Sequence, residues 1–141
     1  MISLSEVQTW TAAGESEVLE FKRTIGERVE AVRTLCAMLN HRGGRVLFGV
    51  TPSGEALGQD VGEHTLERLG EEIRRIEPPV FPTVERVPVG EREVLVVTVG
   101  EGSALTQIDE YVGLEQPGAD PSLVHARVEL VIELGAHVHY V

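Results

Sequence analysis

Two glutamates in the segment ESEVLEFKR, residues 15–23, have the type and spacing to bind catalytic metal ions. Phosphodiester cleavage by two divalent ions needs carboxylates that hold the ions about 3.5–4 Å apart, and Mg²⁺ prefers oxygen ligands of this kind. Glu15 and Glu20 occupy odd and even positions, so a straight strand would send them to opposite faces. They converge only if Glu15 lies on the preceding turn, which Gly14 permits. The pair is therefore a candidate catalytic and metal site for Mg²⁺ or Mn²⁺.

Glu55 or Asp60, both nearby in the sequence, could supply a further carboxylate to such a site. The alternative is structural. Glu15 would then cap a backbone group or form an ion pair, and Glu20 would pair with Lys22 across the same strand face. Both interpretations stay open, because short motifs often match by chance.

The segment NHRGGR, residues 40–45, has the composition of a phosphate-binding turn. Adjacent glycines let a ligand approach the backbone, and guanidinium groups suit phosphate oxygens. If a strand at 18–22 pairs with a strand at 45–50, the bases that follow the first strand come near this turn. The expected nucleic-acid-binding residues are Lys22, Arg23, Arg42, Gly43, Gly44 and Arg45. The same segment also fits a helix C-terminus with glycine just after the last turn, a role compatible with phosphate binding.

The charge of the chain is uneven. The formal net charge is −11, which alone disfavours nonspecific nucleic-acid binding. From Lys22 to Arg45, however, six basic residues stand against two acidic ones, a net charge of +4, whereas the rest of the chain carries −15. One basic segment therefore lies in an acidic protein, and the fold decides whether it becomes a patch.

Length and composition indicate the class of protein and its cellular location. A chain of 141 residues with 42% apolar and 25% charged residues fits one globular domain. No stretch approaches the ~18 apolar residues of a membrane span, and residues 1–10 lack the features of a signal peptide. The single cysteine, Cys36, argues against a disulfide framework. We expect a cytoplasmic protein with no membrane partner.

Two further motifs carry weaker signals. Residues 44–51, GRVLFGVT, partly fit a phosphate-loop pattern, but Val50 takes the lysine position and the intervening residues resemble a buried strand, so an ATP site is rejected. His137 and His139 would share a strand face, with His125 as a third zinc ligand, but no cysteine or placed carboxylate completes the site. The polar face of a terminal strand explains these histidines better. The only cofactor that the sequence suggests is Mg²⁺ or Mn²⁺.

Periodicity predicts the elements that would position these residues. Helices are expected between Ser3 and Gly14, at about 27–40 and at 64–76. Strands are expected at 18–22, at 45–50, as a short return strand at 56–58, and as a hairpin of 83–89 and 92–99. Residues 100–121 have the composition of a loop, and alternation predicts strands at 126–134 and 137–141.

This order of elements predicts an α+β fold in a single domain of residues 1–141. We expect a mixed sheet of about five to seven strands with two main helices packed on it. Residues 100–141 would add a loop and a C-terminal hairpin with an exposed edge. Such an edge can pair with a second copy, which makes a homo-oligomer a further expected partner.

The central stretch resembles the Schlafen AlbA_2 domain, also called divergent AAA-4. The segment GESEVLEFKR is similar to the family's opening Glu-Ser-x-x-x-Glu-Phe-Lys. The segment LCAMLNHRGGRVLFGVTPSGEALG is similar to its helix ending in Ala-x-x-Asn, its Gly-Gly pair and its buried strand ending in Gly-Val. The resemblance covers about residues 14–99 and does not extend to the C-terminal tail, 100–141. It implies nucleic-acid binding, as in bacterial proteins proposed to be DNA-binding transcriptional regulators. For some animal members it implies a metal-dependent ribonuclease that uses two glutamates and an aspartate.

The family's glutamates correspond to Glu15 and Glu20, and its aspartate would follow the Gly-Val strand, where this chain has Thr51-Pro52-Ser53. That replacement argues against catalysis. The favoured function is a nucleic-acid-binding module that grips DNA or RNA phosphates through the basic Gly-Gly turn. A divalent-metal ribonuclease and a non-catalytic protein-interaction or oligomerisation domain remain as alternatives.

Overall fold

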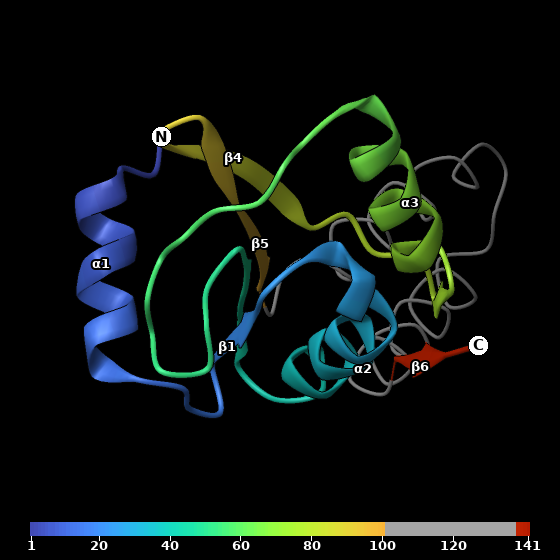
Figure 1. The fold of residues 1–141 in the computed structure, drawn as a ribbon. Helices are drawn as coiled ribbons and strands as arrows, with labels where there is room; N and C mark the ends of the chain where they lie inside the picture. The colour runs from blue at the N-terminus through green and yellow to red at the C-terminus, as the bar shows by residue number, and fades with distance from the viewer. Residues whose placement is uncertain (101–137) are drawn as a thin grey trace, which may run out of the picture.

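The computed structural model describes residues 1–100 and 138–141 (Figure 1). Its helices are α1 (Leu4–Ala13), α2 (Arg28–Leu39) and α3 (Glu63–Ile73), with the short 3-10 helix η1 (Ile25–Glu27) just before α2. Its strands are β1 (Leu19–Lys22), β2 (Gly43–Phe48), β3 (Ile76–Glu77), β4 (Thr83–Val89), β5 (Arg92–Gly100) and β6 (His139–Tyr140). The expected α+β class is confirmed. Within the described residues, no helix is long and apolar enough to cross a membrane.

Four strands form a mixed sheet in the order β1-β2-β5-β4. β1 runs parallel to β2, whereas β5 is antiparallel to both of its neighbours. β3 and β6 form a separate antiparallel pair. The strands of the described part thus agree in number with the expectation, but they divide between two sheets.

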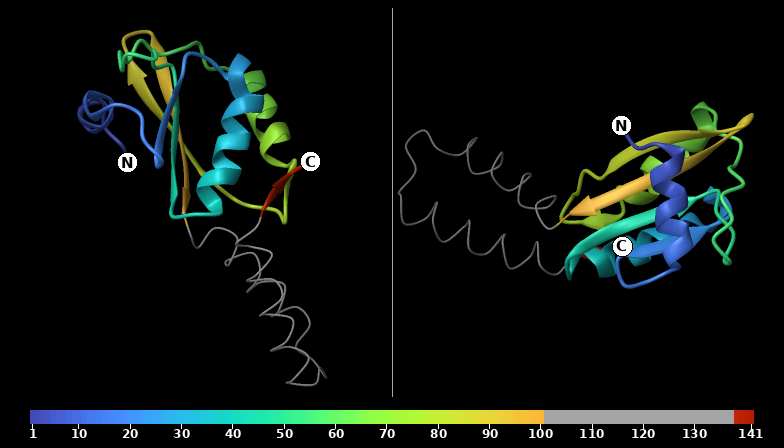
Figure 2. Two further views of the ribbon diagram at one scale, coloured as in Figure 1. Left: turned by 90° about the horizontal axis from the view of Figure 1, so that it is seen from below. Right: turned by 90° about the vertical axis from the view of Figure 1, so that its left-hand side faces the viewer.

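The four-stranded sheet is covered on both faces (Figure 2). α2 and α3 lie on one side, where Val46 and Phe48 of β2 are fully buried. α1 lies on the other side, where Leu47 joins a second apolar cluster with Phe21 of β1. Successive side chains of a strand point to opposite faces, so β2 feeds both clusters. This confirms that its apolar run belongs to a strand buried on both sides.

Local signals set the limits of α1 as expected. The Ser3 hydroxyl accepts a hydrogen bond from the backbone N–H of Glu6 at 3.2 Å, which caps the first turn. The chain leaves the helix at Gly14, whose φ is 85°. A glycine adopts such a backbone angle without a steric penalty.

Two elements differ from the prediction because tertiary contacts overrule the periodicity. α3 ends at Ile73 and not at residue 76, because Ile76 pairs with Tyr140 in the second sheet. The return strand expected at 56–58 is reduced to one bridge between Val50 and Ala56. The predicted hairpin is confirmed over its whole length, from Thr83 to Gly100.

Residues 138–141 pack against α2 and α3. Val138 is 2% exposed and belongs to the core. The Asn40 amide accepts a hydrogen bond from Val138 N at 2.8 Å and donates one to Val138 O at 3.2 Å. The Tyr140 hydroxyl donates to the Glu72 carboxylate, and this hydrogen bond raises the pKa of Tyr140. The strand expected at 126–134 lies outside the described residues, as does the loop of 100–121 beyond Gly100.

Candidate functional site

Glu15 lies on the turn before β1, which is the position that convergence with Glu20 required. Its Oε1 atom accepts a hydrogen bond from the backbone N–H of Phe21 at 2.9 Å. The Glu27 carboxylate accepts one from the N–H of Arg23, also at 2.9 Å. β1 is an edge strand of the sheet, and unpaired edge amides need partners. The structure therefore shows both carboxylates as caps on the outer edge of β1.

Glu20 stands beside Val46 in the register and so faces α2. Its Oε2 atom is buried and has no hydrogen-bond partner among residues 1–100 and 138–141. Lys22 does not serve as its ion-pair partner, because the Lys22 ammonium lies 3.3 Å from the Glu30 carboxylate of α2. The pairing of Glu20 with Lys22 suggested by the sequence is replaced by this strand-to-helix contact.

A metal site needs more than this pair of glutamates. In the described part of the chain, no three side chains of His, Cys, Asp or Glu are grouped so that they could hold a metal ion. Glu55 and Asp60 therefore do not complete a cluster with Glu15 and Glu20. Of the three histidines considered as zinc ligands, His139 is exposed on β6, while His125 and His137 lie outside the described residues.

The turn after β2 has the hydroxyl residues Thr51 and Ser53 where the family pattern suggested an acidic residue. Thr51 is 7% exposed. Its hydroxyl accepts a hydrogen bond from Glu55 N at 3.0 Å and lies 3.0 Å from the Ser53 hydroxyl. Gly54 N donates to Thr51 O at 2.9 Å. The predicted turn is confirmed, and its polar groups are engaged with one another.

The two glycines of the NHRGGR segment are required by close packing. A Cβ on Gly43, whose φ is 82°, would lie 2.4 Å from Val99 O. A Cβ on Gly44 would lie 2.7 Å from Met38 Sδ and 2.8 Å from Val18 O. The predicted glycine cap of the helix is wrong, because α2 is capped by Asn40. The glycines instead open β2 and let it approach both neighbouring segments.

Arg42 and Arg45 lie at this end of the sheet in different environments. The Arg42 side chain is 76% exposed, and its guanidinium lies 3.8 Å from the Glu17 carboxylate, which is 93% exposed. Ion pairs so open to water are weak. The Arg45 guanidinium lies over the Trp10 ring of α1 at 4.4 Å from the centroid, and its Nε has no hydrogen-bond partner among the described residues.

Two surface pockets share Arg42 and Val18. One, of about 310 Å³, lies between α2 and the segment before β1 and includes His41. The other, of about 260 Å³, is lined by both glycines, Arg45 and Thr98. The turn therefore holds an exposed guanidinium between two hollows that are open to solvent, an arrangement that can accept anionic groups.

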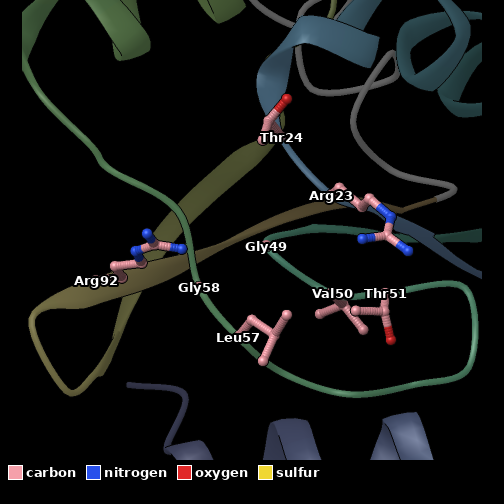
Figure 3. A pocket seen from close by; sticks show the side chains of 8 residues that line it. All are labelled: Arg23, Thr24, Gly49, Val50, Thr51, Leu57, Gly58 and Arg92. Atoms are coloured by element: carbon pink, nitrogen blue, oxygen red, sulfur yellow. The ribbon is translucent and has the colours of Figure 1, made fainter.

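Lys22 and Arg23 do not join this turn, although β1 and β2 pair as expected. The register places Lys22 beside Phe48, three residues beyond Arg45, which is roughly 10 Å along the strand. Arg23 lines a third pocket, together with Arg92 (Figure 3). The basic segment of the sequence is therefore divided between the two ends of the sheet.

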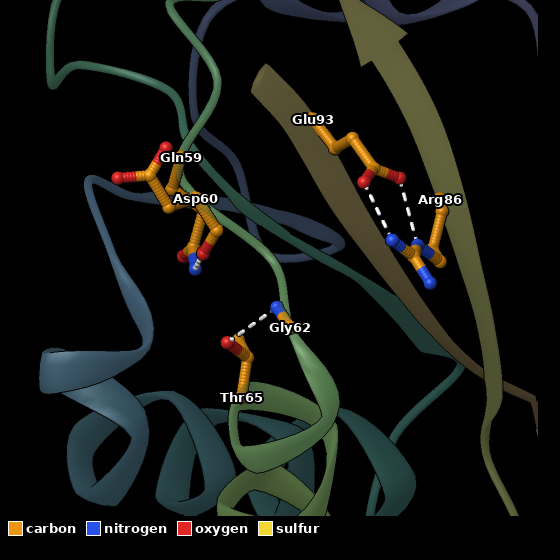
Figure 4. Close-up of polar contacts among 6 residues, drawn as sticks. All are labelled: Gln59, Asp60, Gly62, Thr65, Arg86 and Glu93. Carbon is orange, nitrogen blue, oxygen red and sulfur yellow. Dashed lines mark hydrogen bonds and ion pairs between the residues drawn. The ribbon is translucent and has the colours of Figure 1, made fainter. Parts of the chain in front are cut away.

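Sequence reasoning missed a buried glutamine that fixes the end of the sheet near Arg23. Gln59 is 6% exposed. Its Oε1 accepts a hydrogen bond from Ile25 N at 2.9 Å, and its backbone exchanges two hydrogen bonds with Glu93. Glu93 in turn accepts two hydrogen bonds from the Arg86 guanidinium, at 2.6 and 2.7 Å (Figure 4). This contact lowers the pKa of Glu93. A single polar residue in a loop has no periodic signal, so only the fold reveals its role.

The model of the Schlafen AlbA_2 domain family matches residues 15–122 of the chain. The chain belongs to the Schlafen AlbA_2 family. The match begins at Glu15 and continues beyond residue 99, so it includes part of the segment in which no resemblance was expected. A comparison with functionally curated proteins finds no match.

A solved structure shares the fold of this Schlafen AlbA_2 chain. It is the N-terminal domain of a RecG-related protein from Nitrosomonas europaea, provisionally described as an ATP-dependent DNA helicase. The two structures align with a TM-score of 0.55 and 22% sequence identity, over 72% of this chain and 74% of that one. At this identity the likeness concerns the fold.

Proposed function

We propose that this Schlafen AlbA_2 chain is a nucleic-acid-binding module that contacts phosphate groups through the turn of residues 41–45. The family and the helicase-related description of the structural neighbour support a nucleic-acid-associated role. The observation that carries the proposal is the exposed Arg42 guanidinium, which stands between two surface pockets.

A phosphate would replace a weak partner of Arg42. The contact with Glu17 is 3.8 Å long and open to water, so it contributes little. A guanidinium can instead form two parallel, charge-assisted hydrogen bonds to a phosphate. Exchange of Glu17 for phosphate therefore improves both the geometry and the charge assistance of the Arg42 contact.

Arg45 supports a second contact in the adjacent pocket. The Trp10 ring holds its guanidinium from one side, so less rotational freedom is lost on binding than for a free side chain. Two phosphate contacts correspond to a slope of roughly −2 when log K is plotted against log salt for duplex DNA. The net charge of −11 opposes binding elsewhere on the protein, so affinity should be local and modest.

Fluorescence anisotropy with labelled single-stranded RNA, single-stranded DNA and duplex DNA tests the proposal. The full chain is titrated across a salt series from about 50 to 200 mM, the range over which phosphate contacts weaken strongly. Arg42→Gln removes the central contact. Arg68→Gln is the matched control, because it makes the same charge change at an exposed position of α3.

We expect Arg42→Gln to weaken binding about tenfold at low salt and to make the salt slope shallower by about one. Arg68→Gln should change neither quantity. Equal effects of the two variants would refute a specific role for the turn. Absence of binding at the lowest salt would favour the protein-interaction alternative. Cleavage of RNA in Mn²⁺ that Glu20→Gln abolishes would establish the ribonuclease.

A further inference from the structure

A second basic site lies at the opposite end of the sheet, where β1 and β2 finish. The pocket there has a volume of about 220 Å³ and is lined by Arg23, Thr24, Gly49, Val50, Thr51, Leu57, Gly58 and Arg92. Figure 3 shows the two arginines on either side of the chain at Leu57 and Gly58, with Arg92 beside Gly58 and Arg23 above Thr51. We name this site the Arg23–Arg92 pocket.

The two arginines bring uncompensated positive charge to this pocket. Neither guanidinium has an ion pair or a hydrogen bond with any residue in the described ranges 1–100 and 138–141. Two of the nearby carboxylates have other partners: Glu27 accepts the backbone N–H of Arg23, and Glu93 is held by Arg86. Guanidinium groups without a carboxylate partner are suited to bind phosphate.

Two glycines form the part of the pocket between the arginines. Gly49 and Gly58 have φ values of 101° and 77°, and Gly58 N donates to Gly49 O at 2.8 Å. A Cβ on Gly49 would lie 2.9 Å from Gly58 Cα, and one on Gly58 would lie 2.8 Å from Arg92 Cβ. This close contact requires glycine at both positions and fixes the two segments that line the pocket.

The other lining residues define the chemistry of the ligand further. The Thr24 hydroxyl accepts a hydrogen bond from Gly26 N at 3.1 Å and points away from the two arginines (Figure 3). Leu57 is 46% exposed and gives the pocket an apolar side next to its charges. The combination fits an anionic group attached to a sugar or base better than a free anion.

We infer that the Arg23–Arg92 pocket binds a terminal phosphate, the phosphate monoester of a nucleotide or of a nucleic-acid strand end. A monoester carries a charge of about −1.5 to −2 at pH 7, which the two arginines match, whereas a phosphodiester within a strand carries about −1. At about 220 Å³ the pocket is smaller than typical sites for whole drug-sized ligands, so one phosphate and its nearest ring fill it.

This inference deepens the proposed function and rests on it only for the source of the phosphate. β2 runs from the Arg42 turn to this pocket, and its six residues span roughly 20 Å at about 3.3 Å per residue. A nucleic-acid strand bound at the Arg42 turn can therefore place its terminal phosphate in the Arg23–Arg92 pocket. A free nucleotide would bind in the pocket without contacting the turn.

Competition binding with matched oligonucleotides tests the inference. Pairs of strands carry a phosphate or a hydroxyl at the 5′ end, or at the 3′ end, and are titrated against the full chain. A nucleoside monophosphate and inorganic phosphate are added as competitors to separate the two sources. Arg92→Gln and Arg23→Gln remove the proposed contacts. Arg42→Gln is the control that should weaken all strands alike.

We expect one phosphate-ended strand to bind about tenfold tighter than its hydroxyl-ended partner, as for loss of a charge-assisted contact. Arg92→Gln and Arg23→Gln should abolish this preference, Arg92→Lys should keep part of it, and Arg42→Gln should keep it whole. Circular dichroism checks that each variant folds. If Arg92→Gln does not fold, the result for Arg23→Gln decides whether the pocket causes the preference.

No preference in the wild type, combined with no displacement by the monophosphate, would overturn the inference and leave the proposed function standing. A preference that survives both Arg92→Gln and Arg23→Gln would also overturn it. The protein could also bind the nucleoside monophosphate but no oligonucleotide. If Arg92→Gln then abolishes monophosphate binding, phosphate binding in the Arg23–Arg92 pocket is supported and the proposed function is refuted.

Discussion

Replacement of Asn40 by alanine should release the C-terminal strand from the rest of the fold. The Asn40 side chain forms two hydrogen bonds with the backbone of Val138, at 2.8 and 3.2 Å. Each such bond contributes about 0.5–1.5 kcal/mol, so the expected loss in free energy of unfolding is about 2 kcal/mol. At roughly 3–5 °C per kcal/mol for a chain of this size, the midpoint of thermal unfolding should fall by about 6–10 °C.

Asn40→Asp separates the two bonds. A carboxylate still accepts from Val138 N but cannot donate to Val138 O, so the loss should be at least half of that in Asn40→Ala. His41→Ala is the control, because this neighbouring side chain is exposed on the same turn.

Thermal denaturation and hydrogen exchange measure the effect of Asn40 directly. The Val138 amide should exchange slowly in the wild type and faster in Asn40→Ala, without faster exchange in the middle of α2. If Asn40→Ala unfolds at the wild-type temperature and Val138 remains protected, the reasoning is refuted.

Two further perturbations test the packing and the charge of the sheet. Gly43→Ala should cost about 3–5 kcal/mol, because its Cβ would lie 2.4 Å from Val99 O and φ is positive. Gly90→Ala, with φ of 62° and no atom within 4 Å of its Cβ, should cost only about 1–2 kcal/mol, and equal losses in urea denaturation would contradict the packing explanation. Arg86 lowers the pKa of Glu93 in the folded state, so this contact stabilises the fold above the ordinary glutamate pKa, and the stabilisation is lost as pH falls through the lowered value. Glu93→Gln should remove that part of the pH dependence of the free energy of unfolding. If stability falls with decreasing pH in Glu93→Gln as it does in the wild type, the proposed contribution of this ion pair is disproved.

Elements with strong local signals could be predicted from the sequence. The hairpin turns at Gly90-Glu91 between two runs rich in valine, and the structure pairs Val89 with Arg92 as expected. α1 begins at the Ser3 cap and ends at Gly14. In both places the local residues and the tertiary fold favour the same conformation, so no distant contact is needed to place the boundary.

Features set by distant contacts could not be predicted in this way. The register that separates Lys22 from Arg45 depends on the close contact of Gly44 with Val18, which has no periodic signal. The Asn40 bonds to Val138 join residues 98 positions apart. The role of Glu15 required knowing that β1 is an edge strand, because the same motif suits a cap and a metal ligand equally.

The chain leaves and re-enters the described core at one place. Gly100 pairs with Gly43, and Val138 is held by Asn40, so both points flank the same short turn. The residues that join Gly100 to Val138 therefore leave from and return to the end of the protein that carries the Arg42 turn. A peptide inserted after Gly100 would begin beside this turn, so its effect on nucleic-acid affinity would report on the proposed role of Arg42.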